Sequence, residues 1–159
     1  MLKRLDRILL LLIFSSFCFA AREYQVSKET LGYFDTISSE YADFNEGLHR
    51  QITEEVKKIS ASDFAVYENL ISQFAEANAK MARIDEQLSV QYGTGINRDF
   101  LEDISQQTED TIDYLEAVIA AFKKSKDLAS PVLKGNLQKA LEILQKERDF
   151  LDTVAGELQ

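Results

Sequence analysis

The chain has 159 residues, with 27 Asp and Glu against 18 Lys and Arg, a net charge of −9 at pH 7. A protein this acidic is a poor ligand for nucleic acid, whose phosphates require clustered basic side chains. It contains one cysteine and one histidine, which excludes zinc sites built from several Cys and His and haem attachment through paired cysteines.

Residues 1–20 have the three parts of a secretory signal peptide. Basic residues precede an apolar run over residues 8–17, and the small residues Cys18 and Ala20 follow it. We expect cleavage after Ala20, because the run is shorter than the roughly 20 residues that a membrane-spanning helix needs. Two alternatives remain: the leader is retained as an anchor, or a lipid is attached at Cys18, which the large Phe17 before it disfavours.

Removal of the leader leaves 139 residues, the length of one domain. The leader holds three basic residues and one acidic residue, so residues 21–159 carry a net charge of −11 and no cysteine. Small secreted animal domains usually carry disulfides. We therefore expect an acidic bacterial protein of the periplasm or cell surface, held together by packing, with no membrane span after cleavage.

Residues 27–59 and 62–91 are predicted to form the first two helices. Apolar residues recur along both at steps of three and four, which places them on one face of each helix. Serines at residues 60 and 62 cap free amides between the two helices. In the second helix one set of apolar residues recurs every seven positions, as in a coiled-coil seam: Tyr67, Phe74, Met81 and Leu88.

Residues 98–127 and 131–158 are predicted to form the other two helices. A glycine-containing loop over residues 92–97 precedes the third, and Ser130-Pro131 is a start signal for the fourth. Four helices of similar length with short connections predict an all-α fold, an antiparallel up-down-up-down four-helix bundle over residues 21–159. The alternative is an elongated pair of helical hairpins that completes its core by dimerisation.

Several polar residues interrupt the apolar stripes near mid-height. Counting back from the short connections places Asn78, Tyr114 and Glu147 opposite one another, with Thr111 and Arg148 within a turn. A buried polar layer fixes the register of a bundle at a cost in stability. The same residues suit a small polar ligand inside the bundle, with Arg148 facing an anion. A third interpretation is that the residues are partly exposed and form no layer.

Glu46 and His49 have the Glu-x-x-His spacing of carboxylate-bridged di-iron bundles. Those bundles need two such motifs, and this chain has one histidine. Phe44 and Leu48 belong to the apolar stripe, which turns Glu46 and His49 toward solvent. We therefore expect no metal site, no cofactor and no catalytic residue.

Tyr33, Ile143 and Phe150 are predicted to project beside the helix seams and to form part of a partner or dimer surface. The sequence favours a non-enzymatic, exported module that acts through contacts with an unknown protein or with itself. The alternative is a binding bundle whose interior takes a small molecule or an amphiphile.

Overall fold

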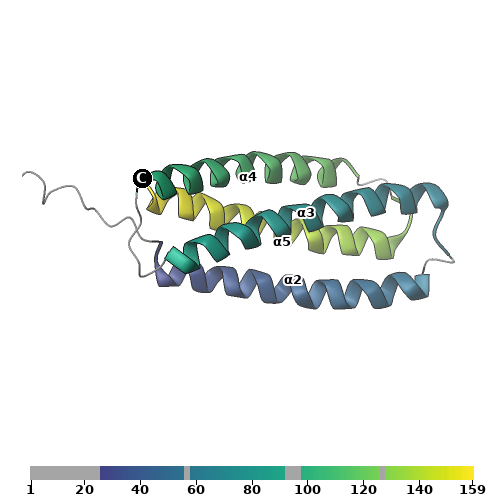
Figure 1. The fold of residues 1–159 in the computed structure, drawn as a ribbon. Helices are drawn as coiled ribbons and strands as arrows, with labels where there is room; N and C mark the ends of the chain where they lie inside the picture. The colour runs from purple at the N-terminus through teal and green to yellow at the C-terminus, as the bar shows by residue number, and fades with distance from the viewer. Residues whose placement is uncertain (1–25, 56–57, 92–97, 126–127) are drawn as a thin grey trace, which may run out of the picture.

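The computed structural model describes residues 26–55, 58–91, 98–125 and 128–159 (Figure 1). The predicted leader, with Cys18 and Ala20, and the predicted loop over residues 92–97 lie outside the described residues. The described residues contain no strand and form four helices: α2 (Lys28–Glu55), α3 (Ala61–Gln91), α4 (Arg98–Lys124) and α5 (Pro131–Glu157). The helices pack against one another, which confirms the predicted all-helical bundle.

Serine side chains cap the starts of α3 and α5. The Ser60 hydroxyl accepts a hydrogen bond from the Asp63 amide at 3.1 Å, before the second turn of α3. The Ser130 hydroxyl accepts one from the Leu133 amide at 3.4 Å, and Pro131 occupies the first turn of α5. These contacts satisfy amides that have no partner inside the helix, so the start signals in the sequence fix where these helices begin.

α5 is the central helix of the bundle. It packs on α4, α2 and α3, whereas α2 and α3, although consecutive, contact each other only slightly. Figure 1 shows α5 between α4 and α2, with α3 crossing over it. Because three helices surround it, α5 buries ten residues, against seven on each of α3 and α4. The core is therefore organised around α5 and is not shared equally among four helices.

The prediction that Ile143 and Phe150 form a partner surface is wrong. Both side chains are fully buried, and the Phe150 ring packs on the Phe34 ring of α2 at a centroid distance of 5.2 Å. A helix with neighbours on three sides buries a wider face than the single seam assumed for it. Of the three predicted surface residues, Tyr33 is exposed.

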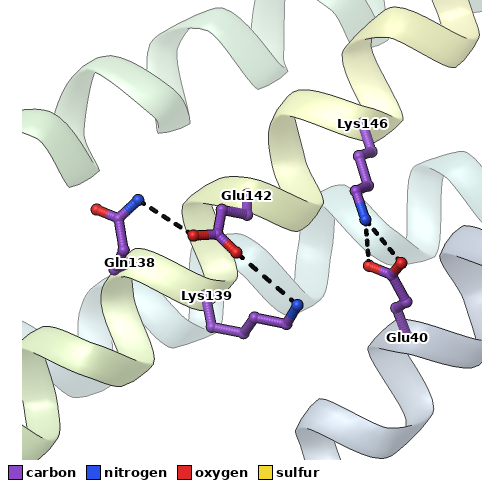
Figure 2. A network of polar contacts seen from close by, with 5 residues as sticks. All are labelled: Glu40, Gln138, Lys139, Glu142 and Lys146. Carbon is purple, nitrogen blue, oxygen red and sulfur yellow. Dashed lines mark hydrogen bonds and ion pairs between the residues drawn. The ribbon is translucent and has the colours of Figure 1, made fainter.

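Polar contacts fasten α2 to α5 at two points. At the start of α2, the Glu157 carboxylate accepts hydrogen bonds from the Ser27 amide at 2.7 Å and the Thr30 hydroxyl at 2.8 Å. Further along, Lys146 Nζ lies 2.6 Å from both carboxylate oxygens of Glu40, as Figure 2 shows. Nearby on α5, Glu142 forms a separate set of contacts with Gln138 and Lys139.

We expect Glu157→Gln to lower the free energy of unfolding by about 1–2 kcal/mol at pH 7. Burial opposes ionisation of Glu157, but the hydrogen bonds from Ser27 and Thr30 outweigh it and hold its pKa below the ordinary value. This stabilisation is present above the unfolded pKa of about 4.5 and is lost as pH falls through the folded pKa. Urea denaturation at pH 7 measures the loss, and the exposed Glu142→Gln is the control. Equal losses in the two variants would contradict the assignment.

Candidate functional site at mid-bundle

Contacts between helices bring the predicted polar residues to similar heights. The Lys80 ammonium of α3 lies 5.0 Å from the centre of the Tyr114 ring on α4. Arg148 Nη2 of α5 lies 3.3 Å from Glu116 Oε1 of α4. Glu147 follows Lys146, which reaches Glu40 on α2. The five predicted residues therefore lie within a few turns of one another along the bundle, but they do not share one environment.

Glu147 is the fully buried member of the set. Its exposed fraction is 0%, and neither carboxyl oxygen has a hydrogen-bond partner among the described residues. Burial raises the pKa of Glu147 to about 8. The half-buried Tyr41 of α2 is close enough that the Glu147 charge, after burial, helps to raise the Tyr41 pKa. The Glu147 carboxyl is therefore mostly protonated at neutral pH, facing α2.

Thr111 and its neighbour Thr108 are buried, yet their hydroxyl groups are already used within α4. The Thr108 hydroxyl donates to the Ile104 carbonyl at 2.8 Å, and the Thr111 hydroxyl donates to the Gln107 carbonyl at 2.7 Å. Bonds of this kind let a hydroxyl face a core without an unsatisfied donor. Asn78 differs, because its buried Nδ2 has no partner in the described part of the chain.

Tyr114 and Arg148 lie toward the outside of the bundle. Burial and the neighbouring Glu76 raise the pKa of Tyr114 to about 12. The Arg148 side chain is 41% exposed and pairs with Glu116, although its buried Nε has no partner within the described ranges. The guanidinium is thus engaged by carboxylates near the surface and does not neutralise Glu147.

Two further features of the site were missed by sequence reasoning. The first is Tyr41 of α2, which lies near the layer, because the charge of Glu147 helps to raise its pKa. Asp85 of α3 is partly buried, and burial together with the negative charge of Asp35 on α2 raises its pKa to about 6. Neither aspartate interrupts an apolar stripe, so no signal in the sequence brings the two together.

Metal-binding geometry is not found in the described stretches: they hold no group of three or more His, Cys, Asp or Glu arranged for an ion. Glu46 of the Glu-x-x-His motif is exposed and lies 3.3 Å from Arg50. The His49 side chain lies outside what the structure describes. Among the described helices, none is both long and apolar enough to cross a bilayer.

Three hollows lined by described residues lie around the first turns of α5, away from Glu147. One of them, about 380 Å³ in volume, is bounded by the last turns of α4 and the first turns of α5. In comparisons with known proteins, no family model, no curated protein and no solved structure matches this chain. Fold and site together define a helical bundle with a buried carboxyl in its core that pairs with none of the described residues.

Stability should fall as pH rises from 5 to 8. The folded pKa of Glu147, about 8, lies above the ordinary value of 4.5, so between these values the folded protein holds a proton that the unfolded chain has released. The contribution of protonated Glu147 to the free energy of unfolding is fully present below pH 4.5 and is lost as pH rises toward 8. The slope of this loss approaches about 1.4 kcal/mol per pH unit. Asp85 adds to the decline up to about pH 6.

Urea denaturation at pH 5, 6, 7 and 8 measures this dependence. In Glu147→Gln the side chain no longer titrates, so most of the decline between pH 6 and 8 should disappear. The same decline in both proteins would show that another group is responsible.

Proposed function

We propose that this protein is an exported, non-enzymatic helical bundle of a bacterial periplasm or cell surface that acts by contact with another protein. The leader pattern of residues 1–20 and the absence of cysteine from residues 21–159 support export. Cleavage after Ala20 would leave Ala21 as the first residue. Recovery of the protein from the envelope fraction, with Ala21 at its amino terminus, is the expected result, and a mature chain that keeps residues 1–20 would contradict it.

We also propose that successive helices run in opposite directions. Contacts at the helix ends support this arrangement. The end of α5 lies at the start of α2 through Glu157 and Ser27. At the start of α3, Asp63 Oδ2 accepts a hydrogen bond from the Ala129 amide, just before α5, at 3.1 Å. In this arrangement α4 packs on α3 and α5, and one long side of α4 is exposed to solvent.

The proposal of protein binding is based on the outer side of α4. Between residues 99 and 122 the sequence contains no Lys or Arg. The exposed positions on this stretch hold seven carboxylates, which we call the acidic face: Asp99, Glu102, Asp103, Glu109, Asp110, Asp113 and Glu116. At a rise of about 1.5 Å per residue, the face extends roughly 26 Å along a rigid helix.

Little positive charge offsets the acidic face. Glu116 pairs with Arg148, whereas Asp103 and Asp110 accept hydrogen bonds from the neutral side chains of Gln107 and Gln106, both at 2.8 Å. A row of like charges repels itself and attracts a partner of opposite charge. Complementary charge speeds association, and salt weakens this attraction. A basic surface on another exported protein is therefore the partner that this geometry favours.

Site-specific photo-cross-linking in the native envelope tests the proposal. A photoreactive residue at Gln106, which is exposed within the acidic face, should give a discrete protein adduct. The same probe at Gln145, exposed on α5, should not. The adduct should vanish when Glu109, Asp110 and Asp113 are changed to amides.

Neutralising three exposed carboxylates of α2, Asp43, Glu46 and Glu54, controls for overall charge and should leave the adduct intact. Absence of an adduct at Gln106, or an adduct that survives loss of the α4 carboxylates, would contradict binding through the acidic face.

Ligand binding inside the bundle is the second candidate, because the Glu147 carboxyl oxygens and Asn78 Nδ2 are buried and have no hydrogen-bond partner among the described residues. It ranks second since Arg148, the expected anion partner, is engaged by Glu116. Thermal stability measured with a panel of metabolites tests it. A compound that stabilises the protein, with the shift lost in Glu147→Gln, would support an interior site, and no shift with any compound would count against one.

A further inference from the structure

The hollow between the end of α4 and the start of α5, named here the α4–α5 hollow, has an apolar floor. Phe122, Leu137 and Leu141 line it. Phe122 and Leu137 are 4% and 6% exposed, and Leu141 is partly buried against the core. The volume of about 380 Å³ lies within the range of roughly 300–1,000 Å³ typical of small-molecule sites. The floor therefore offers apolar contact to a ligand of modest size.

Two lysines lie beside this apolar floor. Lys123 and Lys134 line the same hollow, and both are exposed. Within the part of the chain that the structure describes, the ion pairs include neither of them. Three other lysines do pair with carboxylates: Lys80, Lys139 and Lys146.

The charge at the hollow is opposite to the charge of the protein as a whole. The chain holds 27 acidic residues, yet this apolar hollow is lined by two lysines that have no ion pair within the described residues. Cations beside an apolar surface complement a molecule that has an anionic head and an apolar tail. The acidic remainder of the protein disfavours an anionic bilayer as the partner, so a single free amphiphile fits better than a membrane surface.

We propose that the α4–α5 hollow binds a free fatty acid, with its carboxylate between Lys123 and Lys134 and its acyl chain on Phe122, Leu137 and Leu141. This site is separate from the acidic face of α4 and does not depend on a protein partner. It is also separate from the bundle interior, because the helices need not part to admit the chain.

Calorimetric titration of the delipidated exported protein with monomeric dodecanoate tests the site. Saturable binding of one molecule per chain is expected. Lys123→Glu with Lys134→Glu should weaken binding at least tenfold. Lys124→Glu with Lys139→Glu makes the same change in charge at exposed residues outside the hollow and should change the Kd less than twofold.

Two other ligands separate the effect of the carboxylate from that of the acyl chain. Butyrate keeps the carboxylate but lacks most of the chain, and it should bind at least about a hundredfold more weakly. Dodecyltrimethylammonium keeps the chain but reverses the charge, and it should bind at least tenfold more weakly than dodecanoate.

Four results would overturn the proposal. The first is absence of saturable dodecanoate binding, and the second is an equal loss of binding in the two double variants. The third is binding of dodecyltrimethylammonium as tight as that of dodecanoate. The fourth is binding to phosphatidylglycerol vesicles without binding of monomeric dodecanoate, which would assign the lysines to a membrane surface. None of these results bears on protein binding at the acidic face.

Discussion

Replacing Glu147 with methionine should raise the free energy of unfolding by about 3 kcal/mol at pH 7. Methionine is unbranched and similar in length, so it fills the same space without a buried polar atom. The wild-type carboxyl, with a folded pKa of about 8 against an ordinary 4.5, must take up a proton to be buried at pH 7. Its two oxygens then have no hydrogen-bond partner in the part of the chain that the structure describes. Both costs disappear in the variant, as chemical denaturation would show.

Glu142→Met is the matched control, because Glu142 is an exposed carboxylate on the same helix. Its free energy of unfolding should change by about 0.5 kcal/mol or less. The gain in Glu147→Met should also shrink at pH 5, where the unfolded chain has released less of its proton. A loss of stability in Glu147→Met at pH 7 would mean that the carboxylate has a favourable partner in the folded protein, contrary to the structure.

Phe150→Ala should lower the free energy of unfolding by about 4 kcal/mol, the cost of a large cavity in a packed core. The Phe150 side chain is 0% exposed and packs on Phe34. It lies where α5 meets α2, the helix that contacts α3 least, so its loss weakens the main attachment of α2. Thermal or urea denaturation of the variant measures the effect.

Tyr33→Ala provides the comparison, because sequence reasoning assigned both aromatic residues to one partner surface. The Tyr33 side chain is 40% exposed, and its truncation should cost about 1 kcal/mol or less. If both variants lost equally little stability, Phe150 would be a surface residue and the central position of α5 would be wrong.

The four helices could be predicted because their signals are local. Apolar spacing of three and four residues marks the buried face of each helix, and the serines at residues 60 and 130 mark two starts. The central position of α5 could not be predicted in the same way. Spacing tells which face of a helix is apolar, but it does not tell how many neighbours share that face. Ile143 and Phe150 were misplaced for that reason.

The candidate site was predictable in height but not in environment. Short connections and a fixed rise per residue keep the error in counted heights small. The direction of a side chain is harder to predict, because neighbouring residues on a helix point about 100° apart. Glu147 and Arg148 therefore meet different surroundings: the structure buries Glu147 and leaves Arg148 beside Glu116.

Contacts between distant segments had no local signal at all. The bond from Ser27 to Glu157 joins residues at opposite ends of the domain. The raised pKa of Asp85 depends on Asp35 from another helix. Both follow from how the helices pack, which a single sequence does not specify.

The buried carboxyl of Glu147 can be observed directly by NMR, through the pH dependence of its side-chain ¹³C chemical shift. A bundle packed around α5 with an unpaired acid in its core predicts a midpoint of about 8. A midpoint at or below the ordinary value of 4.5 would contradict it, because the carboxyl would then reach water or hold a partner in the folded protein.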